Sequence, residues 1–237
     1  MKTPLLIAAP LMAGALLVGV ATPAFADGSP SPTPKASHAA ASLSDIQAKG
    51  ATATSKRITS LTAAVSKITA AKGITSADRS TVLATLNADL TGMKTLATRI
   101  AADTTVAAAR ADVRSIYTTY RVYAVALPQA RIVAGADRLT GTTIPRLQQV
   151  SSKLAPKVSG KADLQAKLDD LNAQLKTASS DTDGLAAAAL AVTPADDNAN
   201  HAAMSGLRDK AKAAAAAVKQ AVQDAKAIRQ ALKPASK

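Results

Sequence analysis

The chain has 237 residues, a formal net charge of +13 and no cysteine. It also contains no glutamate and no tryptophan, so its ionisable acid and base groups are 16 aspartates and two histidines beside the lysines, arginines and tyrosines. Most active sites use glutamate, cysteine, histidine and positioned aromatic side chains, and this composition therefore argues against an enzyme. We expect no catalytic residues, no metal and no cofactor, and a fold stabilised by packing without disulfides.

The first 26 residues are typical of a secretory signal peptide. Lys2 supplies a positive start, residues 5–20 are apolar, and Ala-Phe-Ala at positions 24–26 is a typical cleavage site. The apolar run is interrupted by proline and glycine and is shorter than the about 20 residues that a membrane-spanning helix needs. We expect cleavage before Asp27, no integral membrane segment afterwards, and a product that is secreted or non-covalently associated with the cell wall.

Residues 27–42 alternate serine or threonine with proline and carry no apolar period, which predicts a disordered spacer. Residues 43–237 show apolar side chains at helical spacing and no strand pattern, which predicts a helical bundle domain. The expected fold class is all-α: an elongated bundle of antiparallel, coiled-coil-like hairpins with about six helices.

The predicted helices follow from the apolar spacing and from start signals. In chain order they cover residues 43–72, 76–100, 106–139, 145–154, 164–175 and 194–232. Thr75 and Thr193 are the expected N-caps of the second and last helices, because an aspartate follows each of them three residues later. Pro128 falls inside the third pattern, where it predicts a kink rather than a stop.

The last predicted helix has an apolar heptad pattern over four repeats, with alanine at many of the seam positions. Its lysines recur every seven residues along one side, and together with one arginine they form what we call the lysine lane: Arg208, Lys212, Lys219, Lys226 and Lys233. Regularly spaced cations suit a linear polyanion, such as an anionic polymer or surface of the cell envelope. The alternative is a solvated helix face whose lysine stems cover alanine. Specific nucleic-acid binding is not expected, because no aromatic side chains lie there for base stacking.

The segment 110–131 contains every tyrosine of the protein. On a helical wheel Arg110, Arg114, Tyr117 and Arg121 share one flank, and we call these residues the Arg/Tyr cluster. Arginines around a phenol ring can bind a phosphate, a carboxylate, or a stacked sugar or base.

A second stripe of the same segment is expected to face the core: Ile116, Tyr120, Tyr123 and Leu127. The alternative interpretation of the whole segment is structural. In that case the tyrosines fill an alanine-thin core around Pro128, and the arginines are solvated or paired with Asp103, Asp112 or Asp137.

The stretch that begins at Asp196 superficially resembles the start of a calcium loop. Its sixth position is His201 rather than glycine, and its twelfth is Leu207 where a bidentate glutamate is required. We therefore interpret it as a capped helix start.

The predicted signal and spacer, the helix starts of the form [Ile/Val]-Thr-x-Ala-Asp and the segment Tyr120-Arg121-Val122-Tyr123 together resemble a group of small secreted proteins. These are alanine-rich, all-helical actinobacterial proteins with no assigned activity. The resemblance implies export and an all-helical fold, and it supplies no site residues.

The leading hypothesis is an exported, non-enzymatic helical bundle that contacts anionic polymers through its basic C-terminal helix. One alternative is a protein–protein or self-association module that uses the alanine seam. Another is a small-anion binder at the Arg/Tyr cluster.

Overall fold

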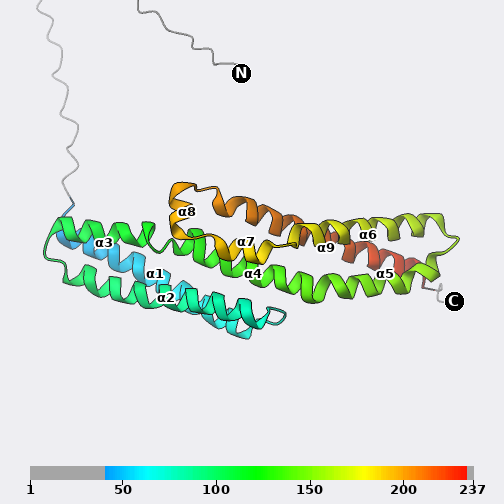
Figure 1. Cartoon of the computed structure of the whole chain (residues 1–237), viewed down its shortest axis with the longest axis horizontal. Helices are drawn as coiled ribbons and strands as arrows, with labels where there is room; N and C mark the ends of the chain where they lie inside the picture. Colours follow the sequence, from blue (N-terminus) through cyan, green and yellow to red (C-terminus); the bar gives the residue numbers. More distant parts are fainter. Residues whose placement is uncertain (1–40, 234–237) are drawn as a thin grey trace, which may run out of the picture. The chain divides into compact units, whose positions relative to one another are not determined.

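The computed structural model describes residues 41–233, and every regular element in this range is helical, which confirms the all-α bundle (Figure 1). The elements, in chain order, are α1 (Leu43–Ala70), α2 (Ser76–Ala102), α3 (Val106–Thr118), the π-helical segment η1 (Val122–Ala126), α4 (Leu127–Arg138), the π-helical segment η2 (Leu139–Thr143), α5 (Ile144–Val158), α6 (Ala162–Thr182), α7 (Leu185–Ala191), α8 (Pro194–Ala199) and α9 (Ala203–Ala231). The predicted signal peptide and residues 27–40 of the predicted spacer lie outside the described residues.

Threonine side chains begin the helices at the predicted positions. The Thr75 hydroxyl accepts a hydrogen bond from the amide of Asp78 at 3.1 Å. The Thr193 hydroxyl accepts one from the amide of Asp196 at 3.2 Å, and the Asp196 carboxylate in turn accepts from the Thr193 amide at 2.8 Å. These bonds satisfy amides that have no partner within the helix. The Asp196 stretch is therefore a capped helix start, as its sequence indicates.

Two antiparallel hairpins, α1–α2 and α5–α6, are each closed by a glycine in the left-handed region. Gly73 has a φ of 84° and Gly160 a φ of 76°. L-residues with a side chain rarely adopt this conformation, so glycine allows each chain reversal without strain. Figure 1 shows both hairpins, with α2 beside α1 and α6 beside α5.

The described residues contain one large core and two smaller neighbouring clusters. The large core is formed by α1, α2, α3, η1, α4, α7 and the start of α9, around fully buried side chains such as Leu61, Met93 and Ile116. The smaller clusters are formed by α5, α6 and α9: one contains Leu168 of α6 and Ile228 of α9, and the other contains Ala178 of α6 and Ala217 of α9. Residues from the start of α6 thus meet residues from the end of α9, so these two helices are antiparallel.

The third predicted helix is broken at residues 119–121. The kink was expected further along the chain, at Pro128. Arg121 has φ 44° and ψ 36°, a left-handed conformation that is uncommon for a residue with a side chain. Pro128 instead lies in the first turn of α4. The break changes the helical phase, so that Tyr123 is 46% exposed instead of facing the core, while Ile116 is buried as predicted.

Three further boundaries differ from the sequence prediction. The helix at Pro145 does not start separately, because η2 joins α4 to α5 without interruption. The last predicted helix is divided at residues 200–202 into α8 and α9. The short helix α7 was not predicted; the buried side chain of Gln129 donates hydrogen bonds to the carbonyls of Ala189 and Leu190 at 2.8 and 3.2 Å and so caps its end.

Among residues 41–233, no helix combines the length and the apolar character needed to cross a membrane.

One aspartate lies in the inward-facing stripe of α2. Asp89 follows Leu86 and precedes Met93, both of which are fully buried. Burial raises the pKa of the Asp89 carboxyl to about 6, because the charged form loses hydration. The folded chain therefore holds this proton more tightly than the unfolded chain does.

Replacing Gly92 by alanine should destabilise the fold by about 1–3 kcal/mol, because the new methyl group would overlap the ring of Tyr120 and lie 2.6 Å from its hydroxyl oxygen. Gly206→Ala in α9 is the matched control, since no atom lies within 4 Å of its added Cβ. It should stabilise the helix by about 0.5–1 kcal/mol. Urea denaturation of both variants measures the difference, and equal effects would contradict the packing of Tyr120 on Gly92.

Asp89→Asn should stabilise the protein at pH 7 by on the order of 1 kcal/mol, because it removes the cost of burying a charged carboxylate. The folded pKa is raised from 3.8 to about 6, so the wild type should gain stability as the pH falls through this window. The advantage of the variant should therefore shrink toward pH 4, as measured by denaturation at a series of pH values. An advantage that is constant with pH would contradict the raised pKa.

Candidate functional site

The lysine lane lies along an exposed flank of α9. Its four lysines are exposed, whereas Ala217 and Ala221 of the same helix are buried against α5 and α6. Lys212 forms a surface ion pair with Asp209, with 3.3 Å between Nζ and Oδ1. A pair exposed in this way contributes little stability and leaves the lysine accessible.

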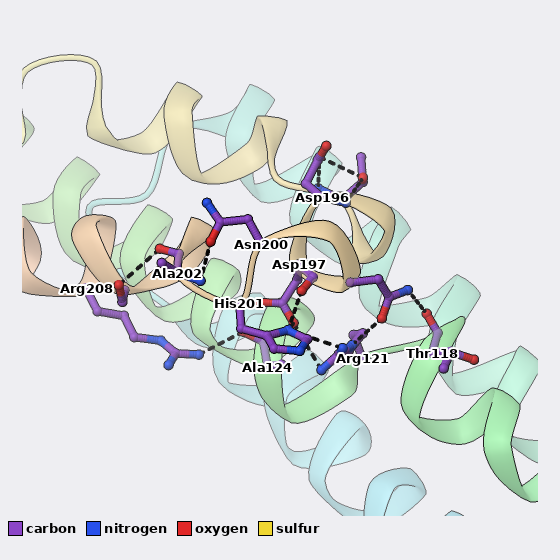
Figure 2. A network of polar contacts seen from close by, with 12 residues as sticks. Thr118, Arg121, Ala124, Asp196, Asp197, Asn200, His201, Ala202 and Arg208 are labelled. Carbon is purple, nitrogen blue, oxygen red and sulfur yellow. Dashed lines mark hydrogen bonds and ion pairs between the residues drawn. The ribbon is translucent and has the colours of Figure 1, made fainter. Parts of the chain in front are cut away.

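Arg208 differs from the lysines of the lane, because it points inward. Its Nη2 donates a hydrogen bond to the carbonyl oxygen of Ala124 at 2.7 Å (Figure 2). Ala124 belongs to the π-helical segment η1, so this bond joins the start of α9 to η1. Arg208 is half-buried and helps to hold α9 against η1, unlike the exposed lysines of the lane.

Helix α5 adds a second row of cations that sequence reasoning did not connect with the lane. The exposed cations of α5 are Arg146, Lys153 and Lys157. Their spacing of seven and four residues places them on one flank of the helix, and α5 contains no acidic residue. Val150 lies on the same flank and faces α9 across a hollow of about 290 Å³.

The hollow between α5 and α9 has an apolar floor and a basic rim. Leu147, Val150 and Val222 line the floor, and Lys226 and Arg229 line the edge on α9. Ile144 clusters with Val218 near the start of α5, and Val158 clusters with Ile228 near its end, so the two helices run in the same direction. Lys226 and Arg229 of α9 thus line the hollow, and the row of α5 cations lies on the flank of α5 that carries Val150.

We call this surface the basic groove and define it by seven residues: Arg146, Lys153, Lys157, Lys219, Lys226, Arg229 and Lys233. Asp224 is the acidic residue of α9 nearest to these cations in sequence. It lies on the opposite flank from Lys226, because side chains two positions apart on a helix point about 200° away from each other. There it accepts a hydrogen bond from the side chain of Gln220 at 3.0 Å.

The structure does not keep the Arg/Tyr cluster together, because Arg121 turns toward α8 (Figure 2). Its Nη1 lies 3.2 Å from Oδ2 of the buried Asp197, and its Nε donates to the Asn198 side chain at 2.7 Å. The side-chain Nδ2 of Asn198 donates in turn to the backbone carbonyl of Thr118 at 2.7 Å, at the end of α3. These contacts hold α8 against the break at residues 119–121.

His201 lies beside this network, where an aspartate and a histidine meet as they do in some hydrolases. Its Nδ1 is 4.0 Å from the Asp197 carboxylate, which is too far for a hydrogen bond. The Asp197 carboxylate is instead engaged by Arg121. The contacts support a structural role for this network, which joins α8 to the α3–η1 junction.

Tyr117 of the cluster has an unpredicted partner on α1. The guanidinium of Arg57 lies between two tyrosine rings, 4.7 Å from the ring centre of Tyr117 and 4.8 Å from that of Tyr123. We call these three residues the Arg57 stack. Arg57 is only 9% exposed, whereas Tyr117 is 49% exposed. The sequence contains an indication that Arg57 is buried, because it occupies a position in the inward-facing stripe of α1, four residues before the buried Leu61.

Arg110 and Arg114 remain exposed on the flank of α3 that carries Tyr117. The expected alternative partner Asp112 is buried and pairs with Arg99 of α2, with 3.0 Å between Nε and Oδ2. The arginines of the cluster are therefore not neutralised by Asp112.

Within residues 41–233, no group of three histidine, cysteine, aspartate or glutamate side chains is placed to hold a metal ion. Comparisons of the chain with protein-family models, with curated proteins and with solved structures found no match.

Asp197→Asn should destabilise the fold by about 2–4 kcal/mol, because it leaves the guanidinium of Arg121 without its buried counter-ion. Asp209→Asn removes an exposed ion pair and is the matched control, with an expected change below about 0.5 kcal/mol. Thermal or urea unfolding monitored by circular dichroism compares the two. Similar small effects would show that the α8 network contributes nothing to the fold.

Proposed function

We propose that this chain is an exported, non-enzymatic helical protein of the cell envelope or extracellular space, and that it binds a linear anionic polymer along the basic groove. The observation that carries this proposal is a hollow between α5 and α9 that Lys226 and Arg229 of α9 line, beside the flank of α5 that carries the exposed Arg146, Lys153 and Lys157. A single lysine row on a helix is common on protein surfaces, whereas two rows along the same groove match the shape of a chain-like ligand.

The dimensions and chemistry of the groove support a polymer rather than a single ion. From Lys219 to Lys233 the α9 row extends over about 21 Å, at a rise of about 1.5 Å per residue. A polymer that neutralises several of these cations releases the counter-ions bound to it. The entropy gained by this release favours binding, and it becomes smaller as salt is added. The apolar floor at Val222 offers contact to the uncharged part of a polymer backbone.

Composition supports the same conclusion. The chain carries a formal net charge of +13, and anionic polymers of the cell surface would attract it over a distance set by ionic screening. Export rests on the signal-like first 26 residues.

The alanine seam favours this proposal over self-association. The seam alanines Ala214, Ala221 and Ala225 are at most 4% exposed, since they pack within the chain. A second copy would have to displace α6 to reach them.

Replacing Arg146, Lys153, Lys226 and Arg229 together by glutamine should weaken binding of a linear polyphosphate by at least tenfold at low salt. The slope of log K against log salt should fall in magnitude by about 3, because each lost phosphate contact on a single chain removes about 0.7 from it. Fluorescence titration with end-labelled polyphosphate across a salt series measures both quantities.

The matched control removes the same charge elsewhere, with glutamine at the exposed Lys72, Lys94, Lys167 and Lys176. It should keep most of the affinity of the wild type at low salt. If both quadruple variants lose affinity equally, net charge alone drives binding and the groove has no special role.

A further inference from the structure

We propose that the surface beside Tyr117 is a second binding site, which takes an anionic sugar such as a sugar phosphate or a uronic acid. It lies on α1 and α3, so it is separate from the basic groove of α5 and α9 and does not depend on the function proposed for that groove.

The Arg57 stack fixes the position of Tyr117 while leaving much of its ring accessible. Arg57 Nη1 donates to the carbonyl of Ala53 at 3.0 Å, which holds the guanidinium on its own helix. The Tyr123 hydroxyl lies 3.2 Å from the hydroxyl of Ser60 and fixes the second ring. The cation thus covers one face of each tyrosine, and about half of the surface of Tyr117 stays in contact with solvent.

The stack also contains an incompletely satisfied donor. Within the described residues, the buried Nε of Arg57 has no hydrogen-bond partner. A buried polar group without a partner is uncommon and destabilising. Among the described residues Arg57 also forms no ion pair with a carboxylate, so its positive charge adds to the field at this surface.

A hollow of about 510 Å³ opens beside the ring of Tyr117. Its lining combines the aromatic ring, small side chains and cations: Ala48, Lys49, Thr52, Ala53, Lys56, Arg57 and Tyr117. Lys49, Thr52 and Lys56 follow one another at helical spacing on α1, so they form one edge of the hollow. The volume is ample for one sugar ring with its substituents.

The charge around the hollow is positive on both helices. Arg110 and Arg114 of α3 share the flank of Tyr117, and Lys49 and Lys56 lie on α1. The acidic residue of α1, Asp45, is engaged in the capping box at the start of the helix. The site therefore attracts an anionic group and offers no carboxylate at its lining.

The combination of an accessible aromatic ring and surrounding cations selects the chemical class of the ligand. The C–H face of a sugar ring packs on an aromatic face, and its phosphate or carboxylate accepts hydrogen bonds from lysine and arginine. The lining is dominated by donors and offers few acceptors to read the edge of a nucleobase. These features favour an anionic sugar over a nucleotide.

The test is an NMR titration of the protein with ¹³C-labelled tyrosine rings, which gives few signals because the chain has three tyrosines and no tryptophan. Glucose 6-phosphate and glucuronic acid should shift the Tyr117 signals in a saturable way, with glucose, inorganic phosphate and AMP as comparison ligands. Glucose and inorganic phosphate should each bind at least fivefold more weakly than glucose 6-phosphate. Equal binding of inorganic phosphate, or tighter binding of AMP, would overturn the proposal.

Substitutions in the hollow test which of its side chains bind the sugar. Tyr117→Leu should weaken glucose 6-phosphate binding by about tenfold, and Tyr117→Phe should keep it within about twofold because the ring remains. Lys49→Gln combined with Lys56→Gln should weaken it by about fivefold, whereas Lys67→Gln on the same helix is the control. For variants that lack Tyr117, the ¹³C signals of Tyr123 and a bound-ligand relaxation measurement report binding.

Unchanged affinity in Tyr117→Leu would refute the stacking role, provided that circular dichroism shows the same helix content. The quadruple basic-groove variant should bind glucose 6-phosphate as the wild type does. Loss of sugar binding in that variant would place the ligand in the groove and refute a separate site.

Discussion

The close packing that alanine permits along α9 is the constraint on which the rest of the helical arrangement depends. Ala214 and Ala221 have no exposed surface, and the helix contacts α6 and α5 along most of its length. Each alanine buries little apolar area, so α9 is held on α5 and α6 by a long contact, whereas bulky side chains such as Leu61 and Met93 fill the large core elsewhere. Long lysine and arginine side chains do not fit such a narrow seam and remain on its flanks. The same constraint that builds the bundle therefore leaves rows of cations on the surface.

Polar contacts complete the fold where the helices are interrupted. At the break after α3, Arg121 adopts a left-handed conformation that is compensated by its ion pair with Asp197. Close by, Arg208 donates a hydrogen bond to the Ala124 carbonyl and so joins α9 to η1. Two of the arginines that sequence reasoning assigned to ligand binding are thus used to hold the junction, and the exposed cations elsewhere are the ones available to a ligand.

The sequence predicts local features of this fold well, because they depend on neighbouring residues. The threonine caps and the glycine turn at residue 73 follow from short-range chemistry. The break at Arg121 is not predictable in this way, because its partner Asp197 lies far away in the sequence. The same distinction holds for the functional surfaces. The lysine row of α9 can be predicted from its heptad spacing. Its α5 counterpart and the position of Arg57 beside two tyrosines depend on tertiary contacts and cannot.

The central claim is that an anionic polymer lies between α5 and α9. Acetylation of lysines with and without bound polyphosphate, read out residue by residue by mass spectrometry, tests it most directly. The account predicts that Lys153, Lys219 and Lys226 become protected from acetylation, while Lys94 and Lys176 outside the groove react as before. Uniform protection of all lysines, or protection confined to residues outside the groove, would contradict the claim.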